Sequence, residues 1–285
     1  MKKFWKSVGI AAAWFAAFLG IQFWISLCGS FLVLADVLKK EGISVFLNAE
    51  RFTELYMGGV LRYVTLIVLI SNLLTIAAFW IFYLCRKKSF ADAVGLHKTS
   101  GKNLVLSILF GFGVCFTVDL LTRFLPIPED MMEAFMQEHS MLWYGDAGLT
   151  FLSVALVGPV SEEICFRGLI YTQLKKGMKT WIAAVLSSVL FGLAHGNPVW
   201  FLVGFLAGLA LSWVYEITGS LYACILVHVT NNAIANITTY VPLSDGANLV
   251  LTVSGLLMLF VSAYFLFREN RKIPVPEIPE ETPVA

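Results

Sequence analysis

Long apolar runs restrict the fold of this chain more than any other feature. Hydrophobic residues make up 58% of its 285 positions and charged residues 14%, whereas soluble domains carry about 25% charged residues. A membrane-spanning α-helix needs about 20 mainly apolar residues and satisfies its backbone hydrogen bonds within the segment. The composition therefore predicts an all-α fold, a polytopic membrane helix bundle.

About eight transmembrane helices are expected from the apolar runs. The candidate spans are 8–34, 61–85, 103–125, 147–173, 180–195, 198–215, 220–238 and 247–267. The first run is longer than the apolar core of a secretory signal peptide, which covers about 7 to 15 residues, and no small-residue cleavage site follows it. We interpret this run as the first membrane helix.

The charge of the connections predicts the orientation of the bundle, because Lys and Arg concentrate in cytoplasmic loops. Basic clusters lie in 86–102, 175–179 and 268–272, whereas the connection 126–146 is acidic and contains no Lys or Arg. With eight spans, the basic clusters and both termini are cytoplasmic and the acidic connection lies outside. The basic residues of the first connection, Lys39, Lys40 and Arg51, do not fit this topology. The compact loops favour a bacterial plasma membrane over the endoplasmic reticulum.

The polar residues divide the chain into regions. We expect N-terminal transmembrane helices and loops in 1–146, a core that carries the intramembrane polar residues in 147–240, and a last transmembrane helix in 241–270. The segment 271–285 alternates Pro and Glu and is predicted to be a disordered tail, because such a composition cannot bury a core.

Composition excludes several classes of site. The five cysteines are scattered singly with no C-x-x-C spacing, so neither a thiolate metal site nor a disulfide framework is indicated. The net charge is +1 and no basic patch with interleaved aromatic residues is present, so no nucleic-acid partner is expected. The expected partners are membrane lipid and a peptide or protein substrate at the membrane.

Three ionisable residues interrupt the fourth span. Glu162, Glu163 and Arg167 lie near its middle, where a charge costs roughly 2.5–3.5 kcal/mol. Glu163 and Arg167 are four residues apart and share a helix face, so we expect them to pair and to leave Glu162 free for acid or base chemistry. Pro159 is expected to bend this helix, with Ser161 satisfying the backbone groups that the proline frees. A purely structural ion cluster is the alternative.

Two later spans carry further polar side chains. His195 follows Phe191 by four residues at the end of the fifth span, and alone it is typical of an interfacial polar cap. His228 and Asn232 are also four apart, so both side chains face the same way. They could direct hydrogen-bond donors at a developing oxyanion, or act as a metal ligand and its orienting partner. Polar contacts between helices are the alternative.

Other polar residues in or near the spans are not expected to be catalytic. Asp119 and Arg123 are four apart near the end of the third span and are predicted to pair with each other. Arg62 lies at the edge of a span, where its side chain can reach the interface. Glu216 lies at a helix end, and His97 and His139 lie in connections.

The three motifs Glu162-Glu163-x-x-x-Arg167, Phe191-x-x-x-His195 and His228-x-x-x-Asn232 resemble the signature of the CPBP intramembrane protease family. That family includes type II CAAX prenyl endopeptidases and bacterial Abi proteins linked to bacteriocin self-immunity. The resemblance covers about residues 147–240, with all three motifs in order and with their internal spacing intact.

The resemblance implies an eight-helix membrane endopeptidase. Glu162 would activate the attacking water, His195 would complete the polar centre, and His228 with Asn232 would stabilise the tetrahedral intermediate. Glu163 and Arg167 would hold the first glutamate in place. The family allows a divalent metal, here zinc on Glu162, His195 and His228, or a glutamate-activated water without metal, and both remain open. The substrate would be membrane-associated, either prenylated and CAAX-type or related to bacteriocins.

Two functions from other classes compete with this hypothesis. Intramembrane carboxylates, histidines and an arginine also build proton relays, so a proton-coupled transporter is one of them. Transporters often contain inverted repeats and paired broken helices, and neither is apparent here. The other is a membrane immunity or binding scaffold without catalytic activity.

Overall fold

The computed structural model describes residues 1–241 and 243–271, and every regular element in these ranges is a helix. The predicted all-α membrane bundle is thus confirmed. Each of the eight predicted spans is helical, and the helices are α1 (Lys2–Glu41), α2 (Ala49–Cys85), α4 (Gly101–Phe124), the continuous stretch α6 to α8 (Ala147–Lys175), α9 (Thr180–Leu193), α10 (Pro198–Thr218), α11 (Leu221–Tyr240) and α12 (Asp245–Asn270).

Six of these eight helices are long and apolar enough to cross a membrane, judged by length and composition. The two others are α9, which has only 14 residues, and α11, in which His228 and several asparagines interrupt the apolar sequence. Both are needed to complete the polar interior of the bundle. The predicted tail lies, from residue 272, outside the described residues.

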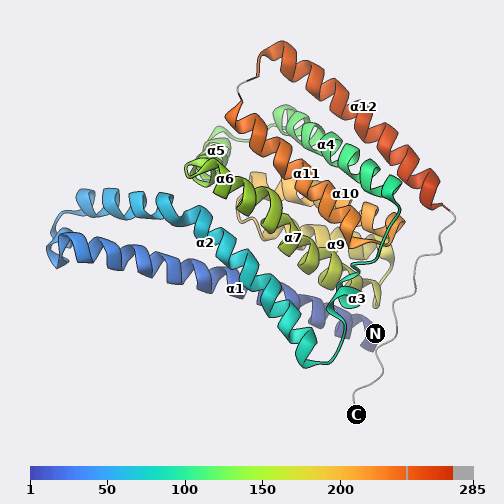
Figure 1. Ribbon diagram of the computed structural model, residues 1–285, viewed down its shortest axis with the longest axis horizontal. Coiled ribbons are helices and arrows are strands. Elements are labelled where there is room, and N and C mark those ends of the chain that lie inside the picture. Colours follow the sequence, from blue (N-terminus) through green and yellow to red (C-terminus); the bar gives the residue numbers. More distant parts are fainter. Residues whose placement is uncertain (242, 272–285) are drawn as a thin grey trace.

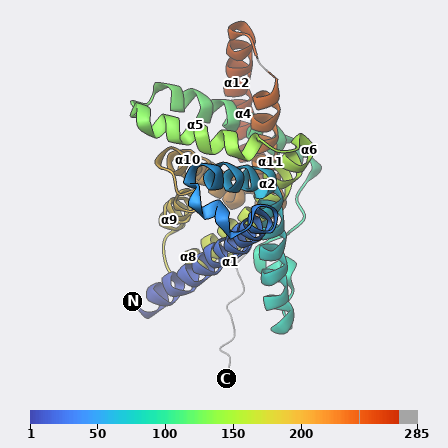
Figure 2. The same cartoon turned by 90° about the vertical axis from the view of Figure 1, so that its left-hand side faces the viewer.

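The hairpin of α1 and α2 is longer than the apolar runs predict. At about 1.5 Å per residue, a 40-residue helix such as α1 is roughly 60 Å long, about twice the thickness of the hydrocarbon layer. Past the apolar run, Asp36 and Lys40 pair across one turn of the helix, and the helix ends before Gly42, whose φ is 74°. The far half of this hairpin extends away from the other helices in Figure 1, and in Figure 2 this side of the molecule faces the viewer.

The acidic connection between the third and fourth spans is a second departure from the prediction. It contains the amphipathic helix α5 (Glu129–Trp143). Its acidic residues begin the helix, where Glu129 and Asp130 interact favourably with the helix dipole. Its aromatic side faces α10, where the ring centroids of Phe135 and Trp200 are 4.7 Å apart.

The basic connection after α2 also packs against the bundle. It forms the one-turn helix α3 (Phe90–Val94), and Val94 is fully buried against Gly168 of the fourth span. A Cβ at Gly168 would lie 2.8 Å from that of Val94, so only glycine permits this contact. The chain then turns at Gly95, whose φ is 78° and whose carbonyl accepts a hydrogen bond from Leu221.

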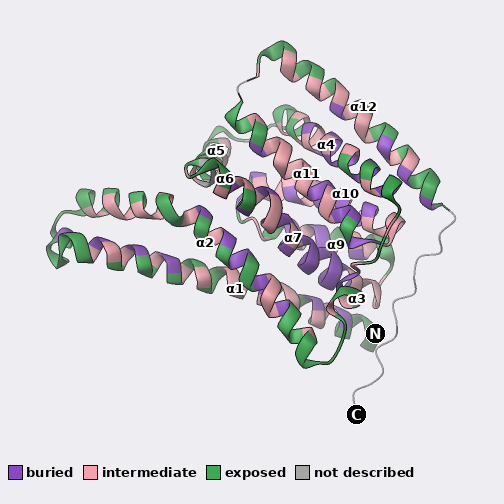
Figure 3. Cartoon of the chain, viewed as in Figure 1, coloured by how far each residue is buried: buried purple, intermediate pink, exposed green. Residues whose placement is uncertain are grey.

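The fourth span lies at the centre of the molecule and is not a uniform α-helix. The α-helical turn α7 (Gly158–Glu163) lies between two π-helical segments, η2 (Phe151–Val157) and η3 (Ile164–Tyr171). Every residue of η3 is buried, and Figure 3 shows this part of the bundle as its most continuously buried region. π-helical turns often occur at functional sites, and here they flank the two glutamates.

Candidate active site

The buried ion pair predicted for the fourth span is present. Arg167 donates from Nη1 to Glu163 Oε1 at 2.9 Å, and both side chains are 0% exposed. The guanidinium also donates to the Gly208 carbonyl of α10 at 3.2 Å and packs over the Phe191 ring at 4.4 Å. Because a buried charge is tolerated only when it is paired and hydrogen-bonded, these contacts link α7, η3, α9 and α10 around one glutamate.

His228 lies between the two glutamates. Its Nδ1 is 2.8 Å from Glu163 Oε1, and its Nε2 is 3.6 Å from Glu162 Oε2. An ionised carboxylate can only accept, so Nδ1 carries a hydrogen and donates it to Glu163. The other ring nitrogen, Nε2, faces Glu162.

The two glutamates differ in exposure as well as in bonding. The Glu162 side chain keeps 23% of its surface exposed, whereas that of Glu163 is completely enclosed. The sequence predicts that one glutamate is paired and the other is free, and the geometry confirms the pairing. Glu162 is not isolated, however, since it shares His228 with its neighbour.

His195 lies just beyond the end of α9, in the turn that leads to α10, and not within a helix. Its Nδ1 bonds to the Phe191 carbonyl at 2.8 Å. Because a carbonyl only accepts, Nδ1 is the donor and Nε2 is left available. His195 forms no hydrogen bond or ion pair with Glu162 or His228 in the described part of the chain. The Phe191 ring packs against both histidines, with ring centroids 4.9 Å apart for His195 and 5.7 Å apart for His228.

Trp200 extends this row of rings to the outside of the bundle, and the sequence did not single it out. Its indole is stacked at 27° on His195, with 6.3 Å between ring centroids. On α5, the His139 ring is stacked at 21° on the same indole with 6.1 Å between centroids. Helix α5 therefore covers the His195 side of the site. A tryptophan in an apolar run carries no sequence signal for this position.

Asn232 satisfies a backbone group that Pro159 leaves free. In η2 the amide of Gly158 bonds to the Ser153 carbonyl, so the next amide would bond to the Val154 carbonyl. Residue 159 is proline and has no N–H. Asn232 donates from Nδ2 to that carbonyl at 3.0 Å. The expectation that Ser161 fills this role is wrong, because the Ser161 hydroxyl bonds to Asn72 instead.

We expect Asn232→Ala to lower the free energy of unfolding by about 1–3 kcal/mol, the cost of an unsatisfied buried carbonyl. In a Pro159→Ala background the same substitution should cost less, because alanine supplies the missing N–H. Thermal unfolding of the four proteins in detergent gives the coupling energy of this double-mutant cycle. Equal costs in both backgrounds would contradict this role of Asn232.

A second polar network holds α7 from the opposite side. Asn72 of α2 accepts hydrogen bonds from Ser161 and from Gln22 of α1. Ser71 in turn bonds to Gln22. Ser161 directly precedes Glu162, so this network fixes the rotation of the turn that carries the glutamate. The sequence signal is an amide side chain inside each of the first two spans, Gln22 and Asn72.

The residues proposed as zinc ligands do not form a metal site as they are arranged. Among the described residues, no three His, Cys, Asp or Glu side chains are close enough to hold a metal ion. Glu162 and His228 face each other, but among the described residues His195 forms no such contact with either and packs against the Phe191 ring. A zinc site needs three protein ligands around one point, and this geometry does not supply the third.

Comparison with known proteins covers the region that contains this site. The family model described as "Type II CAAX prenyl endopeptidase Rce1-like" matches residues 145–234. "Putative membrane peptidase YdiL" of Bacillus subtilis (strain 168) is 30% identical over 84 residues, 30% of this chain and 34% of that protein. "UPF0177 protein YajF" of Lactococcus lactis subsp. lactis (strain IL1403) is 38% identical over 78 residues, 27% of this chain and 35% of that protein.

These matches cover only about a third of the length of either relative, and no solved structure matches the chain. The matched segment contains all three motifs, and with them Glu162, Glu163 and His228. The family indicated by the motifs and the family of the matching model agree. The chain is an integral membrane protein, and its residues 145–234 are similar to the CPBP family that the three motifs also indicate.

Proposed function

We propose that the protein is an intramembrane endopeptidase that hydrolyses a peptide bond with a water activated by Glu162. The observation that carries this proposal is the arrangement around His228. One glutamate is buried and bound to Arg167, and the other is partly exposed and faces the imidazole Nε2 at 3.6 Å. A general base needs access to water and a nearby group that exchanges protons with it, and only Glu162 has both.

The reaction can be written with few groups. The Glu162 carboxylate takes a proton from water as the water oxygen attacks the carbonyl carbon, and the carbonyl oxygen becomes an oxyanion. The Nε2–H of a protonated His228 and the second amide hydrogen of Asn232 are the candidate donors to that oxyanion. When the C–N bond breaks, protonated Glu162 returns the proton to the leaving amine, and the carboxylate is restored.

Glu163 and Arg167 act indirectly in this scheme. Glu163 accepts from His228 Nδ1 and so fixes which imidazole nitrogen faces Glu162. Arg167 compensates the charge of Glu163, since the two are paired at full burial. His195 offers its free Nε2 on the far side of Phe191, where it can contact a substrate backbone or exchange a proton. No step in this scheme requires a metal, and a chelator distinguishes this scheme from a zinc-dependent one.

The proposed substrate is a membrane-associated protein or peptide, prenylated and CAAX-type or related to bacteriocins. Support comes from the description of the matching family, which names CAAX prenyl endopeptidases, and from the name of the Bacillus relative. The location of the site among helices that are long enough to span a membrane also favours a lipid-embedded substrate. Both termini are proposed to be cytoplasmic, in a bacterial plasma membrane, from the charge of the connections.

The test uses detergent-purified protein and a peptide library that includes prenylated C-terminal peptides. We expect Glu162→Gln to lower the cleavage rate by about 10²–10⁴-fold, the usual contribution of a general base. Glu50→Gln is the matched control, because Glu50 is an exposed carboxylate in the first turn of α2. A chelator arm with each protein tests whether a metal takes part.

Three outcomes decide the proposal. Cleavage that is lost in Glu162→Gln and kept in Glu50→Gln supports it. Equal cleavage by the wild type and Glu162→Gln would overturn the mechanism. No cleavage by the wild type across the whole library would overturn the protease assignment and favour a binding scaffold or a transporter, which proton-coupled flux in liposomes would separate.

A further inference from the structure

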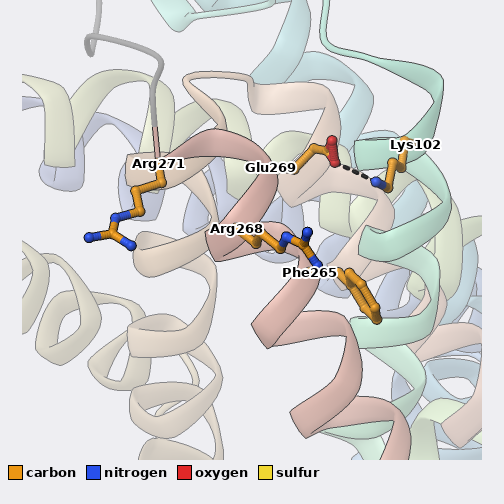
Figure 4. A pocket seen from close by; sticks show the side chains of 5 residues that line it. All are labelled: Lys102, Phe265, Arg268, Glu269 and Arg271. Carbon is orange, nitrogen blue, oxygen red and sulfur yellow. Dashed lines mark hydrogen bonds and ion pairs between the residues drawn. The ribbon is translucent and has the colours of Figure 1, made fainter.

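A cationic cavity lies at the end of the bundle where α4 begins and α12 ends, far from the three motifs in sequence. It has a volume of about 550 Å³ and is lined by Lys102, Phe265, Arg268, Glu269 and Arg271. Figure 4 shows Lys102 and Glu269 joined at one side, Arg268 beside Phe265, and Arg271 at the opposite side. Pockets that hold small ligands measure about 300–1,000 Å³, so the size is sufficient for a small charged group.

The two helices that form the cavity are firmly fixed to each other. Asn103 and Asn270 exchange hydrogen bonds between their amide side chains at 2.9 and 3.0 Å, and both are buried. Further along, a Cβ at Gly113 would lie 2.6 Å from the Leu259 amide nitrogen, so the backbones of α4 and α12 are in close contact. The two helix backbones that form the cavity are therefore held against each other without a ligand.

The cavity has more positive charge than it can pair internally. Lys102 is bound to Glu269, which is the one acidic residue among the described residues of the lining. Arg268 and Arg271 form no ion pair or hydrogen bond with any described residue and are both exposed. Three cations around one carboxylate leave two guanidinium groups available, and guanidinium groups bind phosphate oxygens in a bidentate manner.

The position of the cavity along α12 places it at the membrane surface. Tyr264 and Phe267 are 59% and 53% exposed on the outer side of α12, directly before Arg268. Aromatic residues are enriched at the boundary between hydrocarbon and headgroups, and cationic side chains follow at headgroup level. Phe265 adds an apolar wall to the cavity. A ligand there would contact apolar and charged groups together, as a phospholipid does at the headgroup level.

We propose that this cavity between α4 and α12 binds the phosphate headgroup of an anionic phospholipid, with Arg268 and Arg271 as its ligands. The group that the two arginines would recognise is a phosphate mono- or diester. The lipid would lie in the leaflet on the side of the basic connection 86–102, which leads into α4. The site is independent of the proposed peptidase reaction, because none of its residues belongs to the motifs.

The test is native mass spectrometry of the full chain in detergent with added phosphatidylglycerol, phosphatidylcholine, or inorganic phosphate. We expect phosphatidylglycerol to bind at least tenfold more tightly than phosphatidylcholine. Each of Arg268→Gln and Arg271→Gln should weaken phosphatidylglycerol binding about fivefold, which converts to about 1 kcal/mol, the value for one cation near an anionic surface. Raised salt should weaken the same binding.

The control is Lys87→Gln with Lys88→Gln, which removes two exposed charges from the same end of the bundle without changing the cavity. Retained binding in this control, together with loss in the arginine variants, supports the site. Equal loss in the control would show attraction by overall charge only and would overturn it. Equal phosphatidylglycerol binding by the wild type and the arginine variants would also overturn it. If inorganic phosphate displaces phosphatidylglycerol at a concentration similar to that of the lipid, the ligand is a free anion and not a lipid.

Discussion

Arg167→Met is expected to lower the free energy of unfolding by about 3–5 kcal/mol, the cost of leaving a buried charge without its partner. Methionine fills a similar volume but leaves Glu163 with one fewer hydrogen bond in a fully enclosed position. It also removes the donor to the Gly208 carbonyl and the cation over Phe191. Thermal unfolding in detergent, or denaturation in mixed micelles, measures the effect.

The chain contains a matched control for this experiment. Arg123 pairs with Asp119 over the same four-residue spacing, with N–O distances of 3.0 and 3.3 Å, but these side chains are 61% and 46% exposed. Exposed ion pairs contribute about 0–1 kcal/mol to the free energy of unfolding. Arg123→Met should therefore change stability little. Similar losses for Arg123→Met and Arg167→Met would show that burial of the Glu163 pair does not matter.

The second large effect is expected at His228, where two substitutions separate fold from chemistry. In His228→Asn the amide nitrogen can take the place of Nδ1 and keep the hydrogen bond to Glu163. The nitrogen that faces Glu162 is lost. We expect the protein to unfold within a few degrees of the wild type, while kcat/KM for the peptide substrate falls by about 10²–10⁴-fold.

His228→Gln is the complementary variant. Its amide nitrogen can approach the place of Nε2, but the bond to Glu163 is lost and a buried carboxylate loses a donor. We expect this protein to be clearly less stable than His228→Asn. A His228→Asn variant that keeps full activity would exclude the imidazole Nε2 from the reaction. If His228→Asn is as unstable as His228→Gln, the contact with Glu163 requires an imidazole.

Much of the fold could be predicted because membrane helices are specified locally. Each apolar run forms its backbone hydrogen bonds within itself, so all eight predicted spans are helices with ends displaced by a few residues in most cases. The errors lie where the apolar signal ends before the helix does. In the α1–α2 hairpin, the Asn48 cap and the Asp36–Lys40 ion pair favour helix beyond the apolar runs. In α5, Glu129 and Asp130 lie in the first turn, where the helix dipole favours them. Hydropathy reports none of these interactions.

The candidate site was predicted in part for the same reason. Glu163 and Arg167 are four residues apart, so local helical geometry was enough to predict their pair. The His228 contact with both glutamates joins segments 65 residues apart along the chain, and no local spacing indicates it. The roles proposed for Glu162, His195, His228 and Asn232 in catalysis stay predictions.

The sequence by itself determined the membrane bundle, its approximate spans, the buried pair and the family to which the motifs belong. Only the tertiary structure decided which polar groups meet. It placed His228 between the two glutamates, packed the Phe191 ring against both His195 and His228, and turned Asn232 to the Val154 carbonyl. The physical reason is that helix formation needs only neighbouring residues, whereas a shared proton or a capped carbonyl depends on how separate helices pack and rotate against one another.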